Sequence, residues 1–138
     1  MNAKHYISLE AAKMLKEKGY NEDCDYCFYY DDYHDKWDFD LPYNLFDDEP
    51  MYYNNETIDD EMYSMPTLLE AIDWLEERGI RIVIRLKIHD IDCKEINYWY
   101  YEVLTSIYAN PIREFGGLMH TDRNECMQKA IEKALELL

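Results

Sequence analysis

Residues 80–88, IRIVIRLKI, alternate strictly between two kinds of side chain, and this pattern constrains the fold more than any other stretch. Isoleucine or leucine occupies every even position, whereas three cations and a valine occupy the odd ones. A period of two places the two sets on opposite faces of a β-strand, one on a core and one largely in water. After the polar stretch HDIDCKE, residues 96–107 (INYWYYEVLTSI) are typical of a second strand, so the sequence predicts an antiparallel hairpin.

Three helices are predicted from apolar residues at helical spacing, over about residues 8–19, 67–79 and 121–138. The first begins with a serine suited to the N-cap, and the first two end at a glycine. The second begins with a T-x-x-E capping box, in which Thr67 and Glu70 satisfy each other's backbone N–H groups. The third begins with a threonine or an aspartate as its cap.

The predicted fold class is α+β, with a small antiparallel sheet and about three helices packed on one face. The element order is α-β-(acidic excursion)-α-β-β-α in a single domain, residues 1–138, long enough to bury one ordinary core. The β element before the excursion is CDYCFYY, and a short strand is expected near Leu118 and Met119. Residues 31–65 show no sustained period, so we interpret them as a long acidic, Tyr-rich excursion packed onto the domain.

Acidic side chains are concentrated in one segment of the chain. The net charge is −16, and between Glu22 and Glu61 there are 15 acidic residues against one basic residue, Lys36. The other 15 acidic and 13 basic residues leave the rest of the chain close to neutral. Such a negative field repels phosphate backbones and anionic lipid surfaces. The charge pattern therefore argues against direct binding of nucleic acid or membranes.

Tyrosine is the second component of this segment, since eight of the 14 tyrosines lie between Tyr26 and Tyr63. Tyrosine supplies a large, fairly rigid contact area with a polar tip, and surrounding carboxylates suit a basic protein partner. The alternative is an acidic surface that only keeps the protein in solution. The predicted binding residues are Tyr29, Tyr30, Asp31, Asp32, Tyr33, Asp35, Trp37, Asp38, Tyr52 and Tyr53.

The cationic cluster Arg81, Arg85 and Lys87 lies on the odd face of the first predicted hairpin strand. One hypothesis is that these cations, beside aromatic residues, hold an anionic small molecule such as a nucleotide. The favoured interpretation is a solvated strand face whose charges are offset by carboxylates on a neighbouring strand or on the excursion.

Four cysteines are present, and without a secretion signal we expect reduced thiols. If CDYCFYY is a strand, Cys24 and Cys27 point to opposite faces and cannot bind one ion together. Neighbouring aspartates raise the pKa of these thiols, contrary to the needs of a redox pair. A metal site that recruits His34 or Cys93 is the alternative to structural thiols.

The stretch HDIDC offers a second set of metal ligands, His89, Asp92 and Cys93. It falls where the hairpin turn is expected, and aspartate is a common turn residue. Turn chemistry is therefore favoured over metal binding there. No metal and no other cofactor is predicted.

The sequence contains no recognisable catalytic motif. It has no G-x-S-x-G elbow and no glycine pattern for phosphate binding, and its few serines have no adjacent histidine. We therefore predict a non-enzymatic protein. No apolar run approaches the roughly 20 residues that span a bilayer, and the N-terminal segment lacks the features of a signal peptide. A cytoplasmic location is the expectation.

The stretches MPTLLEAIDWLEERGIRIVI, NYWYYEV and CMQKAIEKALELL together resemble a family of small uncharacterised proteins. These proteins are encoded by bacteriophages, prophages and mobile elements of gut bacteria. The most specific part is the P-T-L-x-x-x-x-x-W-L helix that runs into a strand, and the N-terminal helix ISLEAAKMLKEKGY is also similar. The resemblance leaves out most of the acidic excursion and transfers no catalytic residue. It implies a phage or mobile-element context inside a bacterial host cell.

These observations lead to one main functional hypothesis and two alternatives. The main hypothesis is a non-enzymatic, phage-type accessory protein that binds a basic protein partner through its acidic, Tyr-rich segment. Its sharpest form is inhibition of a host nucleic-acid-binding or defence protein. The alternatives are a binder of an anionic small molecule, and a virion-associated protein or homo-oligomer in which the excursion packs on a sister chain.

Overall fold

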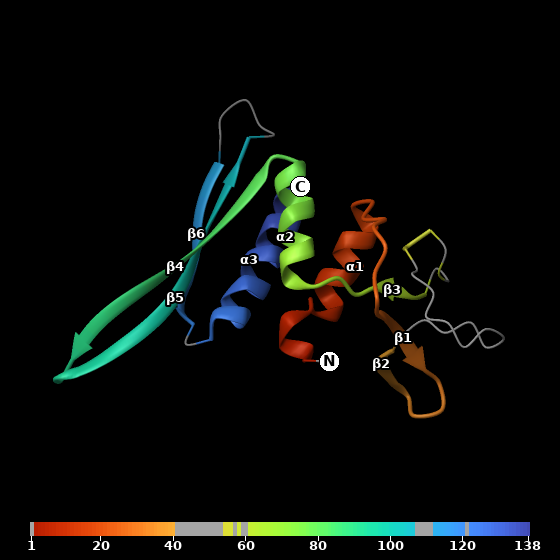
Figure 1. Ribbon diagram of the computed structural model, residues 1–138, viewed down its shortest axis with the longest axis horizontal. Coiled ribbons are helices and arrows are strands. Elements are labelled where there is room, and N and C mark those ends of the chain that lie inside the picture. The colour runs from red at the N-terminus through yellow and green to blue at the C-terminus, as the bar shows by residue number, and fades with distance from the viewer. Residues whose placement is uncertain (1, 41–53, 57, 59–60, 107–111, 121) are drawn as a thin grey trace. The chain divides into compact units, whose positions relative to one another are not determined.

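The computed structural model describes residues 2–40, 54–56, 58, 61–106, 112–120 and 122–138 (Figure 1). It confirms the predicted α+β class, with three α-helices and antiparallel strands. The chain divides into two compact units, one of residues Tyr6–Thr67 and one of Met1–His5 with Leu68–Leu138. Each unit contains its own three-stranded sheet, where the sequence predicted one sheet.

In its described residues, the unit of residues 6–67 contains one helix and a sheet with strand order β2-β1-β3. Its two ends meet, because Tyr6 pairs with Thr67 and the Ile7 N–H donates to the Pro66 carbonyl oxygen at 3.1 Å. The elements are α1 (Leu9–Glu17), β1 (Cys27–Asp31), β2 (Lys36–Asp40) and β3 (Tyr63–Ser64).

The second unit consists of two helices, a short 3-10 turn and a sheet with strand order β4-β5-β6. In Figure 1 both helices lie on the same side of this sheet. Its elements are η1 (Ala3–His5), α2 (Leu68–Glu77), β4 (Ile80–Ile91), β5 (Lys94–Thr105), β6 (Ile112–His120) and α3 (Arg123–Leu137).

The helix ends follow the predicted capping residues. The Ser8 side chain accepts a hydrogen bond from the Ala11 N–H, and Asp122, one of the two predicted caps of α3, accepts one from the Asn124 N–H at 2.8 Å. Gly19 and Gly79 take φ values of 93° and 85° after their helices, a conformation that costs other residues more than glycine. Local sequence thus sets these boundaries.

The core of the second unit lies between the helices and one end of the sheet. Ile80, Val103 and Thr105 are at most 2% exposed and share one face by strand register. On α2 the buried residues are Leu68, Ala71, Trp74 and Leu75, and on α3 they are Cys126, Met127, Ala130, Ile131, Ala134 and Leu135. Full burial of each larger aliphatic side chain is worth about 1.5–3 kcal/mol, so this apolar layer stabilises the unit.

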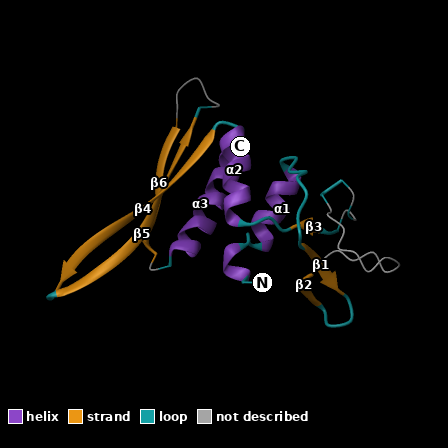
Figure 2. Cartoon of the chain, viewed as in Figure 1, coloured by secondary structure: helices purple, strands orange, loops and turns teal. Residues whose placement is uncertain are grey.

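The predicted hairpin is present and longer than the alternation alone indicated. β4 and β5 pair without interruption from Ile80 opposite Thr105 to Ile91 opposite Lys94. Asp92 and Cys93 form the turn with φ values of 52° and 62°, the left-handed pair of a two-residue type I′ turn. Figure 2 shows the hairpin continuing beyond the helices of its own unit. The short strand expected near residues 118–119 is β6, over nine residues.

Candidate functional site

The β1–β2 hairpin contains eight of the ten predicted binding residues. Its strands pair in register, with Phe28 opposite Phe39 and Tyr30 opposite Trp37. The two rings of each pair meet edge to face, with centroids 6.4 Å apart in the first pair and 5.5 Å apart in the second. Since paired residues lie on one face of a sheet, these four rings form what we call the aromatic face.

The aromatic face packs within its own unit. The Trp37 ring lies 5.8 Å from the Tyr63 ring, and the Lys13 Nζ of α1 lies 4.9 Å from the centre of the Trp37 ring. Lys16 Nζ lies 5.3 Å from the centre of the Tyr63 ring and donates a 2.7 Å hydrogen bond to the Met62 carbonyl oxygen. Cation–π contacts of this kind are worth about 0.5–1 kcal/mol each at exposed sites. They hold the hairpin on α1.

The opposite face of the hairpin carries carboxylates, and we call Tyr29, Asp31, Asp38 and Asp40 the acidic face. Asp38 lies opposite Tyr29, and Asp40 lies opposite Cys27. Burial, and then the negative charges of Asp38, Asp40 and Asp31, raise the pKa of the Tyr29 hydroxyl above its usual value. Lys36, the one basic residue of these two strands, lies opposite Asp31 on the same face, so three carboxylates stand against one cation there. The acidic face therefore presents a concentrated negative potential.

The turn between the two strands adds further acidic and aromatic groups. Asp31 Oδ1 accepts hydrogen bonds from the Tyr33 N–H at 3.1 Å and the His34 N–H at 3.2 Å. Asp31 Oδ2 lies 2.6 Å from His34 Nδ1, and this bond, helped by the two backbone N–H groups, lowers the pKa of Asp31. Asp35 has a φ of 51° and accepts a hydrogen bond from the Tyr30 hydroxyl. Tyr33 is 90% exposed at the tip.

The structure divides the predicted binding residues among three places. Tyr29, Asp31 and Asp38 lie on the acidic face, and Tyr30 and Trp37 lie on the aromatic face. Asp32, Tyr33 and Asp35 lie in the turn, whereas Tyr52 and Tyr53 lie outside the described residues.

Two contributors were missed by the sequence reasoning, Asp40 of the acidic face and Lys13 beneath the aromatic face. The signal for Asp40 was present in KWDFD, where aromatic and acidic residues alternate with a period of two. Interpreting residues 31–65 as an excursion without a period concealed that strand. Lys13 gave no sequence signal, because its contact with Trp37 joins residues 24 positions apart.

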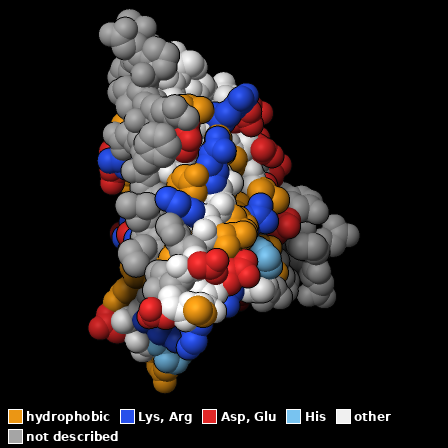
Figure 3. Space-filling view, turned by 90° about the vertical axis from the view of Figure 1, so that its left-hand side faces the viewer, with side chains coloured by type: hydrophobic (Ala, Val, Ile, Leu, Met, Phe, Trp, Pro, Cys, Tyr) orange, Lys and Arg blue, Asp and Glu red, His pale blue; other side chains and the backbone are white. Residues whose placement is uncertain are grey.

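The basic face, which we define as Arg81, Arg85 and Lys87, lies on β4, and two of its cations are paired with carboxylates. Arg85 Nε lies 3.6 Å from Glu102 of β5, which is 2% exposed, and Arg81 lies 3.3 Å from Glu76 of α2. Lys87 is exposed. Figure 3 shows Lys and Arg side chains between hydrophobic ones on the side of the molecule where this sheet lies in Figure 1.

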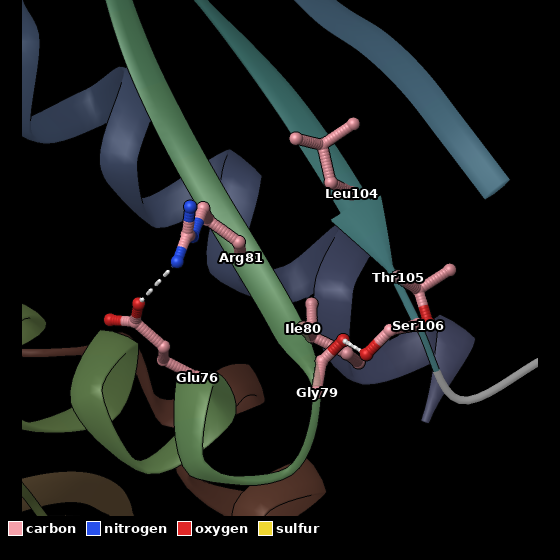
Figure 4. A pocket seen from close by; sticks show the side chains of 7 residues that line it. All are labelled: Glu76, Gly79, Ile80, Arg81, Leu104, Thr105 and Ser106. Carbon is pink, nitrogen blue, oxygen red and sulfur yellow. Dashed lines mark hydrogen bonds and ion pairs between the residues drawn. The ribbon is translucent and has the colours of Figure 1, made fainter. Parts of the chain in front are cut away.

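An open hollow of about 430 Å³ lies beside the turn between α2 and β4 (Figure 4). The Glu76–Arg81 ion pair lies at its wall, and the Ser106 hydroxyl donates to the Gly79 carbonyl oxygen at 3.2 Å. The hydroxyl is thus bonded to backbone, and among the residues that the structure describes no histidine lines the hollow to act as its base. Its other lining residues are Ile80, Leu104 and Thr105.

The thiols of Cys24 and Cys27 have separate partners. Cys24 Sγ lies 3.7 Å from the Tyr20 hydroxyl, whereas Cys27 Sγ lies 3.8 Å from the Asp40 carbonyl oxygen. Burial, and then the charge of Asp40, raise the pKa of Cys27 to about 11, which disfavours the thiolate that a metal or a redox reaction requires. All four cysteines lie within the described residues and form no disulfide.

The other predicted metal ligands also have structural placements. Asp92 and Cys93 occupy the β4–β5 turn. Position 89 lies in β4, where it pairs with position 96 of β5, two residue pairs before the last pair of the hairpin. Within the described residues, no group of three or more His, Cys, Asp or Glu side chains is arranged to hold a metal ion.

Comparisons with known proteins give no further assignment. The chain matches no protein-family model, no curated protein and no solved structure. Across the described ranges, none of the helices has both the length and the apolar character needed to cross a membrane. The resemblance to phage and mobile-element proteins stays a prediction based on the sequence motifs alone.

Proposed function

We propose that this chain is a non-enzymatic accessory protein that binds a basic protein partner through the acidic face and turn of the β1–β2 hairpin. The observation that carries the proposal is that the acidic residues and most of the aromatic residues of the two strands, which are interleaved in the sequence, lie on opposite faces of the hairpin. Strand alternation collects Asp31, Asp38 and Asp40 on one face, and the turn adds Asp32 and Asp35. Five carboxylates thus stand within 14 residues that contain one lysine.

Two properties of the hairpin favour binding, namely attraction at a distance and a contact surface that is already formed. A concentrated charge of one sign raises the rate at which an oppositely charged protein arrives, and fixes its orientation. Tyr33 at the tip then offers a large ring and a hydroxyl without first having to be uncovered. Because α1 already holds the aromatic face, less ordering entropy is lost on binding.

The resemblance to phage and mobile-element proteins suggests where this binding would take place. In that context, the protein acts in the cytoplasm of a bacterial host and occupies the basic groove of a nucleic-acid-binding or defence protein. A row of carboxylates imitates the negative charge of a phosphate backbone and competes for the same arginines and lysines. A direct nucleic-acid ligand is disfavoured by the same charge.

The small-molecule alternative has weaker support. Arg81 and Arg85 of the basic face already lie beside Glu76 and Glu102, so an incoming anion would compete with carboxylates of the protein itself. A thermal-shift screen against a nucleotide panel separates the two proposals, since a bound ligand stabilises the folded state. We expect no shift in melting temperature.

The main proposal is tested by affinity capture from bacterial lysate, with mass spectrometry, at about 50 mM and about 500 mM salt. Screening across this range strongly weakens charge attraction, so the partner should be recovered at low salt and lost at high salt. The variant Asp38→Asn/Asp40→Asn should recover at least about tenfold less partner. Asp73→Asn/Glu77→Gln on α2 removes the same charge elsewhere and is the matched control. Equal recovery by the two variants, or no specific protein at low salt, would refute the proposal.

A further inference from the structure

Within the part of the chain that the structure describes, β4 is an outer strand with one edge open. The strand order β4-β5-β6 gives this 12-residue strand a neighbour on one side only among the described strands. Backbone N–H and C=O groups along such an edge are a template for another strand. Edges of this length are usually protected by charged side chains, which reject unwanted partners.

The side chains of β4 define what kind of strand fits this edge. Leu86 is 44% exposed and Ile88 is 58% exposed, so large aliphatic groups remain in water on one face. On the other face Arg85 and Lys87 flank Leu86 in sequence. Arg85 uses Nε for its contact with Glu102, so its terminal nitrogens can meet a second carboxylate. The edge therefore fits a strand with the pattern acid–apolar–acid.

That pattern occurs at the other sheet edge of this chain. In the described part of the unit of residues 6–67, β2 is the edge strand of the order β2-β1-β3. Phe39 of β2 is 37% exposed and is flanked by Asp38 and Asp40. The two edges thus carry exposed apolar residues of similar accessibility between charges of opposite sign.

We propose that β2 of a second copy of this chain adds to the edge of β4. If Phe39 lies opposite Leu86, then Asp38 and Asp40 lie opposite Arg85 and Lys87 whether the strands run parallel or antiparallel. Each matched cross-strand pair stabilises the contact, and the new backbone hydrogen bonds add to this. Lys36, the one basic residue of β2, falls opposite position 83 or 89, away from the matched cations.

The same charges reject the alternative pairings. Two β4 edges would bring arginines and lysines together, and two β2 edges would bring aspartates together, which destabilises a sheet. Only the mixed pairing joins opposite charges. Because each copy offers one β2 and one β4 edge, the contact is head-to-tail and builds chains or closed rings.

The first test is sedimentation velocity of the purified wild-type protein from about 1 to 200 μM. We expect the mean mass to rise with concentration at about 50 mM salt, and to fall back toward the monomer at about 500 mM. A monomer at every concentration in low salt would overturn the inference, whatever any variant does.

Two blocked variants make the test specific. Leu86→Glu/Lys87→Glu places acids on the β4 edge and keeps the Arg85–Glu102 ion pair, and Asp38→Lys/Asp40→Lys places cations on the β2 edge. Each variant alone should be monomeric where the wild type associates. An equal mixture should regain association, because the intact β2 edge of one variant can meet the intact β4 edge of the other.

Thermal melts establish that both variants fold, and Leu69→Glu, a change at a 63% exposed site on α2, should associate like the wild type. If both folded variants stay monomeric when mixed, the inference is wrong. If the two variants instead still associate by themselves, the edges named here are not the contact.

The inference stands apart from the proposed function, although both involve the acidic hairpin. Leu86→Glu/Lys87→Glu leaves that hairpin unchanged, so it should still capture a basic partner from lysate while failing to self-associate. Failure of partner capture with intact self-association would remove only the proposed function. The reverse result would remove only the β4–β2 contact.

Discussion

The β1–β2 and β4–β5 hairpins both alternate two kinds of side chain between their faces, but they differ in charge. The first has five acidic residues and one basic residue over residues 27–40, whereas the second has four of each over residues 80–105. The first sets aromatic rings against carboxylates, and the second sets aliphatic side chains against cations. The first hairpin therefore has a net charge of −4, whereas the second is neutral.

The two compact units also differ in net charge. Residues 6–67 contain 17 acidic and 4 basic residues, a net charge of −13, and the rest of the chain contains 13 acidic and 10 basic residues, a net charge of −3. The less charged unit has the longer strands and the broad buried faces of α2 and α3. Self-repulsion within the acidic unit destabilises it, which is consistent with a surface retained for contact with a partner.

The largest effect is expected from breaking the helix layer that supports β4 and β5. Leu75→Ala removes a side chain of α2 that is fully buried, and it should lower the free energy of unfolding by about 2–5 kcal/mol. Leu69→Ala, on the same helix at 63% exposure, should change it by less than about 0.5 kcal/mol. Urea unfolding followed by circular dichroism measures both, and equal losses would contradict the assigned core.

The next largest effect is expected in the reactivity of the cysteines of the two hairpins. Cys93 is exposed in the β4–β5 turn, whereas Cys27 is buried in β1 with its pKa raised to about 11. At pH 8 Cys93 should react with iodoacetamide on the order of 100-fold faster than Cys27, whose reaction needs local opening. Peptide mapping by mass spectrometry gives both rates, and Cys93→Ser identifies the fast site. Comparable rates would place Cys27 on the surface.

A smaller effect is expected at the one buried carboxylate of β5. Arg85→Met removes the guanidinium that lies 3.6 Å from Glu102, and we expect a loss of about 1–3 kcal/mol in unfolding free energy. Lys87→Met removes a cation from the same face and should cost less than about 0.5 kcal/mol. If both changes cost the same, the Arg85 contact would have no special role.

The smallest effect concerns acid and the β1–β2 turn. Because the pKa of Asp31 is lowered in the folded state, its contribution is present above the ordinary aspartate pKa of about 3.9 and is lost as the pH falls through the lower folded value. Asp31→Asn should therefore be less stable than wild type at pH 7, and the difference should shrink in acid. Asp32→Asn is the control. Thermal melts from pH 7 to 2.5 measure the difference in melting temperature between Asp31→Asn and wild type, and a difference that stays constant over this range would contradict the prediction.

Much of the second unit could be predicted from sequence because its signals are local. The alternation of residues 80–88 defined β4, and Ser8, Gly19 and Gly79 marked helix ends through their own conformational preferences. Trp74 shows where this reasoning stops. Helical spacing groups Leu68, Ile72 and Leu75 on one stripe of α2. Trp74 lies outside that stripe and is still only 3% exposed, because the position of the neighbouring elements decides how wide the buried face is.

The candidate site was less predictable for a physical reason. Acidic and aromatic residues suggested contact, but their division into two faces depends on the register of β1 with β2, which joins positions across a turn. Tyr30 and Trp37 were predicted as contact residues, and the structure shows in addition that they meet each other on the aromatic face. The division into two units was equally hidden, since the sequence has no linker with the usual glycine- or proline-rich composition.

The most direct test of the acidic face as the contact surface is an NMR titration of the ¹⁵N-labelled protein with an arginine-rich peptide. The Leu86→Glu/Lys87→Glu variant is used, so that self-association does not compete. We predict that amide shifts concentrate in residues 29–40 at about 50 mM salt and vanish at about 500 mM, while exposed acids of α3 such as Glu125 and Glu136 do not respond. Shifts spread evenly over all exposed acids would contradict the account.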